Sequence, residues 1–147
     1  MKLKYFYTVV FLLVSFPVAS EEKIEPSGFH NKLYGTWIAE TVSGRAVTGA
    51  CKKTFVTYKS DGKLESQSGE NISYQSYEAI PKTDKWVIRA KVISSNNKPN
   101  CQGYSMKQMD THDVPDLIVN IEGDRMLWYS DLNATLPFVT LLKKTTK

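Results

Sequence analysis

Histidine and cysteine are scarce in this chain, and the sequence motifs of common enzyme classes are missing. Only two of the 147 residues are histidines, and no Cys-x-x-Cys or His-x-x-x-His pair is present to build a metal cage. The chain also has no Gly-x-Ser-x-Gly elbow and no phosphate-cradling glycine-rich loop. We therefore favour a non-enzymatic protein and assign no catalytic residue, no cofactor and no metal. An enzyme that uses paired carboxylates across a barrel is the third alternative, after a binding protein and an inhibitor.

One loop mixes side chains that are able to bind metal. His112 lies between Met109 and Asp113, and Asp110, Asp113 and Asp116 are spaced three residues apart. A calcium loop needs denser ligands and a turn glycine at a defined position, and neither is found here. We interpret Asp110 to Asp116 as an exposed polar loop.

No apolar run reaches the roughly 20 residues that a transmembrane helix requires. The run from Tyr5 to Phe16 follows Lys2 and Lys4 and is followed by small residues, an order typical of a secretory signal peptide. We expect cleavage after Ser20, with Ala19 as the alternative. The mature protein would then be exported to the periplasm or the extracellular space without membrane insertion.

The chain also lacks a large excess of positive or negative charge. Because Lys2 and Lys4 lie in the predicted signal peptide, the net charge falls from +4 in the whole chain to +2 after cleavage. So small an excess gives no support to nucleic-acid binding. The expected partners are a small molecule or a secreted protein.

The two cysteines, Cys51 and Cys101, both remain after cleavage. An even cysteine count in an exported chain predicts a disulfide. Closing a loop of about 50 residues would remove about 4 kcal/mol of unfolded-state entropy in the chain-entropy model. We predict that the two residues are bonded to each other.

The mature chain divides into a polar, irregular segment at residues 21–32 and a domain at residues 33–147 made of short strand-like runs. The predicted runs are Leu33–Val42, Lys52–Lys59, Lys63–Ser68, Ile72–Ile80, Lys85–Ile93, a weaker Cys101–Met109, Leu117–Ile121, Met126–Ser130 and Phe138–Leu142. Residues of the fifth run alternate between apolar and charged, which indicates a half-buried strand.

Tight-turn residues separate several of these runs. Ser60-Asp61-Gly62 and Glu122-Gly123-Asp124 each predict a β-hairpin. Turn residues recur about every ten residues and no long helix is indicated, which argues against a βαβ fold. The fold class is therefore all-β, with about eight antiparallel strands in an up-and-down barrel, or alternatively a sandwich.

The first strand opens with Leu33-Tyr34-Gly35-Thr36-Trp37, and here the chain resembles the lipocalin and calycin superfamily. Those proteins open an eight-stranded barrel with a Gly-x-Trp element. The resemblance implies that Trp37 plugs the closed end of the barrel. It also implies that a basic side chain from near the last strand, Lys143 or Arg125, packs against the indole.

A second, looser resemblance is to small periplasmic inhibitors of bacterial proteases. They are similar in having a short barrel, an early Gly-x-Trp element, one disulfide and an irregular N-terminal segment that enters the target. Residues 21–32 would be that segment here. This resemblance implies an inhibitor or immunity-type protein that acts on a secreted hydrolase or toxin.

Aromatic side chains are frequent in the predicted strands, and such side chains line apolar ligand pockets as well as ordinary cores. We predict a small apolar or aromatic ligand inside the barrel, bound by Tyr74, Trp86, Tyr104 and Trp128. Adjacent Trp128 and Tyr129 must point to opposite faces of their strand, so one of them is a candidate for contact with a partner.

Overall fold

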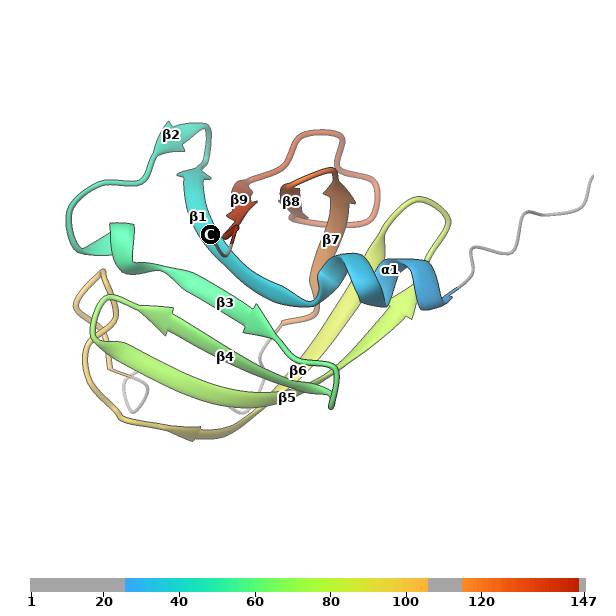
Figure 1. Cartoon of the computed structure of the whole chain (residues 1–147). Helices are drawn as coiled ribbons and strands as arrows, with labels where there is room; N and C mark the ends of the chain where they lie inside the picture. The colour runs from blue at the N-terminus through green and yellow to red at the C-terminus, as the bar shows by residue number, and fades with distance from the viewer. Residues whose placement is uncertain (1–25, 106–114, 146–147) are drawn as a thin grey trace, which may run out of the picture.

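The structure is a computed structural model that describes residues 26–105 and 115–145 (Figure 1). The predicted signal peptide, residues 1–20, lies outside these ranges, as do residues 106–114. No helix in the described part of the chain is both long enough and apolar enough to cross a membrane.

Within the described residues, nine antiparallel strands form one sheet, and all but β2 close into a barrel. They are β1 Gly35–Val42, β2 Arg45–Ala46, β3 Phe55–Tyr58, β4 Lys63–Ser68, β5 Asn71–Pro81, β6 Trp86–Ser95, β7 Leu117–Glu122, β8 Arg125–Tyr129 and β9 Val139–Lys143. Strand β9 returns to pair with β1, with Lys143 opposite Trp37. The all-β, up-and-down barrel is therefore confirmed over the sandwich.

Both predicted tight turns are present. Gly62 and Gly123 have φ angles of +76° and +59°, which glycine adopts without the clash that a Cβ would cause. They allow β3 to pair with β4 and β7 to pair with β8 as hairpins. Strand β2 forms a short hairpin with the end of β1 and takes no part in closing the barrel.

The N-terminal segment differs from the prediction of an irregular chain at residues 21–32. The described part of it forms helix α1, Pro26–Leu33. Phe29 and Leu33 are four residues apart, so they share one face of the helix, and both are buried. An eight-residue helix is marginal by itself in water, so α1 depends on burying this face against the barrel.

The prediction of a weaker strand at Cys101–Met109 is wrong for residues 101–105, which the structure describes. The chain turns at residues 101–105, where the Asn100 side-chain oxygen accepts hydrogen bonds from the backbone N–H groups of Gln102 and Tyr104. Asparagine favours turns through such local bonds. Residues 106–109, like 110–114 of the predicted loop, lie outside the described ranges.

The disulfide between Cys51 and Cys101 is present, as predicted, with the two Cα atoms 4.8 Å apart. Cys51 belongs to the short 3-10 helix η1, Gly49–Lys53, which precedes β3, and Cys101 follows β6. The bond therefore links two connections that are 50 residues apart in the sequence.

Gly69 allows the backbone to approach this disulfide closely. Its φ angle is +63°, and an added Cβ would lie 2.8 Å from the Cys101 backbone nitrogen. Alanine here would suffer left-handed strain of about 1–2 kcal/mol and would also clash with main chain. We expect Gly69→Ala to lower the free energy of unfolding by about 2–4 kcal/mol in urea denaturation.

Gly123 offers a matched control for this substitution. Its φ angle is also left-handed, but an added Cβ would meet no atom within 4 Å. Gly123→Ala should therefore show the backbone strain alone, about 1–2 kcal/mol. If Gly69→Ala and Gly123→Ala lower the free energy of unfolding equally, the close contact with the Cys101 backbone does not contribute.

Candidate functional site

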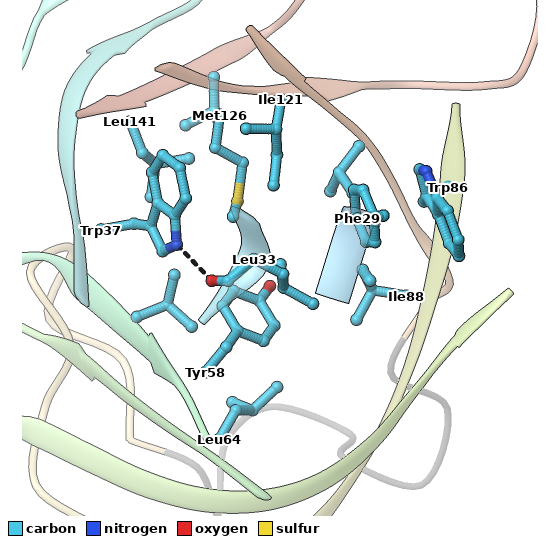
Figure 2. Close-up of a cluster of buried hydrophobic side chains, with 13 residues drawn as sticks. Phe29, Leu33, Trp37, Tyr58, Leu64, Trp86, Ile88, Ile121, Met126 and Leu141 are labelled. Carbon is cyan, nitrogen blue, oxygen red and sulfur yellow. Dashed lines mark hydrogen bonds between the residues drawn. The ribbon is translucent and has the colours of Figure 1, made fainter. Parts of the chain in front are cut away.

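Helix α1 lies across the end of the barrel at which β1 begins, here called the closed end (Figure 1). Its side chains Phe29 and Leu33 enter a buried cluster with Trp37, Ile121 and Met126 (Figure 2). Leu33, Trp37 and Met126 have no exposed surface. This end of the barrel is filled by the protein's own side chains.

Trp37 is held at the closed end by polar as well as apolar contacts. Its Nε1 donates a 2.8 Å hydrogen bond to the carbonyl oxygen of Leu33 (Figure 2). The Lys143 ammonium lies 5.1 Å from the centroid of the Trp37 ring and donates to the carbonyl oxygen of Lys32. Lys143 is thus the basic partner, whereas Arg125 pairs with a carboxylate on β1.

Trp86, predicted to bind ligand, belongs to the closed end instead. Its ring stacks on Phe29 with centroids 3.9 Å apart and planes 9° apart. Only 5% of Trp86 is exposed. Because Phe29 comes from the segment that was predicted to be irregular, no sequence pattern indicated that the Trp86 ring is covered by a helix.

A cavity of about 370 Å³ occupies the other half of the barrel. Strand β3 runs antiparallel to β1, so its first residue, Phe55, lies at the end away from α1, here called the far end. Phe55, Ser68 at the end of β4 and Leu117 at the start of β7 all line the cavity. Small-molecule pockets occupy about 300–1,000 Å³, so the size suits a small ligand.

One wall of the cavity is apolar. It is formed by Ile88 and Ala90 on β6, Leu117 on β7, Trp128 on β8 and Leu141 on β9. These strands lie next to one another in the barrel, so the apolar side chains form a continuous surface. Such a surface favours the apolar part of a ligand through burial.

The facing wall, from β4 and β5, carries polar side chains next to Leu64. Ser66 and Gln75 line the cavity, and Ser73 lies buried behind them. The hydroxyls of Ser66 and Ser73 are hydrogen-bonded at 2.7 Å, and Gln75 Nε2 donates to both, at 3.2 and 2.9 Å. We call these three residues the polar cluster.

Two further polar atoms belong to residues that line the cavity. Thr54 Oγ1 and Trp128 Nε1 are both buried, and neither has a hydrogen-bond partner among the described residues. An unpaired buried polar atom costs about 1–3 kcal/mol, and native structures contain few of them.

Of the four predicted ligand-binding residues, the structure brings only Trp128 to the cavity. Tyr74 and Tyr104 are 46% and 55% exposed, so their placement in the interior was wrong. Tyr74 shares the outward face of β5 with Glu78, while Gln75 points inward. Tyr104 lies in the turn after the disulfide rather than on a strand.

Tyr129 lies on the outside of the barrel, as its position next to Trp128 requires, but it is not an exposed contact. Only 7% of Tyr129 is exposed. The Lys85 ammonium lies 4.9 Å from its ring centroid and donates a hydrogen bond to the carbonyl oxygen of Leu132. Lys85 and the connection after β8 therefore cover this tyrosine.

Tyr58 and Tyr77 meet edge to face inside the barrel, with ring centroids 5.1 Å apart. Burial, and secondly the neighbouring Tyr77, raises the pKa of Tyr58 above its usual range. Burial, followed by Tyr34 and Asp61, raises the pKa of Tyr77 to about 12. Both phenols are therefore uncharged at neutral pH, so neither supplies the anion that a cationic ligand would need.

No three histidine, cysteine, aspartate or glutamate side chains lie close enough to hold a metal within residues 26–105 and 115–145. The Met109–Asp113 segment, considered above for metal binding, lies outside those ranges.

Comparisons with protein families, curated proteins and solved structures give no match to this chain. Its function is therefore inferred from the fold and the cavity.

Proposed function

We propose that this chain is an exported, non-enzymatic binding protein that holds a small apolar or aromatic molecule inside its barrel. The observation that carries the proposal is the cavity of about 370 Å³ left between the closed end and the far end. Most small barrels of eight strands fill their interior with side chains or hold one small ligand. Here side chains fill the closed end, and the cavity leaves room for one small ligand.

The composition of the cavity supports an apolar ligand. Ile88, Leu117, Leu141 and the ring of Trp128 offer apolar surface, and the polar cluster offers a few hydrogen-bonding groups. Ligand sites combine these two features, since burial supplies affinity and a few polar groups fix orientation.

A lipocalin-like relationship is part of this proposal. Gly35 has a φ angle of +115°, Trp37 is buried at the closed end, and Lys143 lies over its ring. These are the features that the Gly-x-Trp resemblance implied. They support a barrel that is closed at one end and binds ligand from the other.

Export is supported by the N-terminal sequence and by the disulfide. Residues 1–20 have the order of charged, apolar and small residues that is typical of a signal peptide. Disulfides persist mainly in oxidising compartments, and Cys51 and Cys101 form one here. We place the mature protein in the periplasm or the extracellular space.

The inhibitor hypothesis is less well supported. It assigned target contact to residues 21–32 or to the Asp110–Asp116 loop, of which residues 110–114 lie outside the described ranges. In the first segment and directly after it, Phe29 and Leu33 are buried in the barrel. These side chains stabilise the closed end, so they are not available to a partner. Deleting the segment would therefore damage the fold as well as any interface.

Ligand binding can be tested with N-phenyl-1-naphthylamine, a neutral apolar dye whose fluorescence rises in apolar surroundings. We expect the mature protein to bind the dye at one site. Ala90 lines the cavity, so Ala90→Phe should fill part of it and weaken binding by about ten-fold or more. Fluorescence titration measures both affinities.

Ser76→Phe is the matched control, because Ser76 is exposed on the outward face of β5. It adds the same ring outside the barrel and should leave dye affinity unchanged. Equal affinity in Ala90→Phe and wild type would place the dye outside the cavity. No dye binding by the wild type would overturn the proposed function.

A further inference from the structure

Among the described residues at the cavity wall, the polar cluster is the only set of side chains that hydrogen-bond to one another. It joins β4 and β5 on the inward face, where an apolar core would be expected to continue from Leu64. Ser73 is buried, and Ser66 and Gln75 are half-buried. Removing polar groups from water is costly unless they are paired, so three of them together call for an explanation.

The hydrogen-bonding capacity of the cluster is only partly used. The Gln75 Nε2 donates to both serine hydroxyls, and one hydroxyl donates to the other. One serine O–H group and the Gln75 Oε1 atom therefore remain without a partner among the described residues. The cluster can thus donate one hydrogen bond and accept one.

The cavity also lacks charge. None of its described lining residues is acidic or basic. A carboxylate or an ammonium placed there would lose its hydration without gaining an ion pair, which strongly disfavours binding. A carboxylate would also meet the unpaired Gln75 oxygen, which repels it.

We propose that the ligand is a neutral amphipathic molecule, with an apolar body against Ile88, Leu117 and Trp128 and one uncharged head group on the polar cluster. The head group must both donate and accept a hydrogen bond, as a primary alcohol or an amide does. This inference rests on the proposed function, because it names the ligand class of the same cavity. Ser66 and Gln75 contact the head group, and Ser73 positions them.

The test compares three probes with the same alkyl chain: 1-octanol, octanoate and octylammonium, at pH 7.5. Each is measured by isothermal titration calorimetry on the mature protein. We expect octanol to bind at least about ten-fold more tightly than either ion. Octanoate or octylammonium binding as tightly as octanol would overturn the inference.

A variant then links the preference to the polar cluster. Gln75→Leu removes the unpaired oxygen and both N–H donors at similar volume, so it should weaken octanol binding by about ten-fold. N-phenyl-1-naphthylamine packs mainly against the apolar wall, so its affinity should fall by a smaller factor than that of octanol. Ser76→Ala, on the opposite face of the same strand, is the control and should change neither affinity.

The outcomes separate the two proposals. Dye binding without any preference for octanol, or unchanged octanol binding in a folded Gln75→Leu variant, overturns this inference alone. Failure of the wild type to bind the dye overturns the proposed function and this inference together. If Gln75→Leu fails to fold by circular dichroism, the ratio of octanol to octanoate affinity in wild type still decides.

Discussion

Replacing Trp37 with alanine should lower the free energy of unfolding by about 3–5 kcal/mol, the range for removing a large buried aromatic. Trp37 has no exposed surface and contacts side chains from α1 and from the opposite strands of the closed end. The substitution would also leave the Leu33 carbonyl without the indole donor. Urea unfolding followed by far-ultraviolet circular dichroism measures the loss.

Two further variants make this result interpretable. Trp37→Phe keeps a ring but loses the Nε1 hydrogen bond, so it should fall between wild type and Trp37→Ala. Tyr74→Ala removes an aromatic side chain that is 46% exposed and should change stability by about 0.5 kcal/mol or less. If Trp37→Ala costs no more than Tyr74→Ala, the closed end is not the stabilising core described here.

The barrel was predictable because its determinants are local. The hairpins at Ser60–Gly62 and Glu122–Asp124 depend on turn glycines, and the alternation along Lys85–Ile93 fixes which face of β6 points inward. Neither of these inferences requires knowledge of contacts between distant residues. Closure of the sheet does require it, because β9 must pair with β1, and local patterns therefore left a sandwich open as the alternative.

Helix α1 could not be predicted in the same way. Phe29 and Leu33 have helical spacing, but two apolar residues in eight give a weak pattern. The helix exists because Phe29 stacks on Trp86, 57 positions along the chain, and because Leu33 enters the barrel. Tertiary contacts, rather than local preference, determine this segment.

The candidate site was only partly predictable, for a related reason. Of the four aromatic residues expected to bind the ligand, Trp86 fills the closed end and Tyr74 and Tyr104 are exposed, so only Trp128 reaches the cavity. The inward residues Ser73 and Gln75 are polar, and such residues are mostly exposed, so composition gives no sign that they face the interior. Tyr74 and Glu78 are four residues apart, so they lie on the same face of β5. The charge of Glu78 was the one local sign that this face, and Tyr74 with it, points outward.

Removing the disulfide should have an effect as large as that of Trp37→Ala, but through the unfolded state. The bond between Cys51 and Cys101 closes a loop of 50 residues, and chain entropy assigns such a loop about 4 kcal/mol. Folded domains are stable by about 5–15 kcal/mol, so the double variant Cys51→Ser, Cys101→Ser should fold but unfold at much lower urea concentration.

Reduction of the wild-type protein is the matched experiment, because the chain has no other cysteine. Adding dithiothreitol should lower the stability of wild type to that of the double variant and should leave the variant unchanged. The Cys51 and Cys101 side chains do not line the ligand cavity, so the folded double variant should still bind the neutral dye. Equal unfolding free energies for oxidised wild type and the variant would contradict the role of the disulfide. Loss of dye binding in the folded variant would instead show that the bond shapes the far end of the barrel.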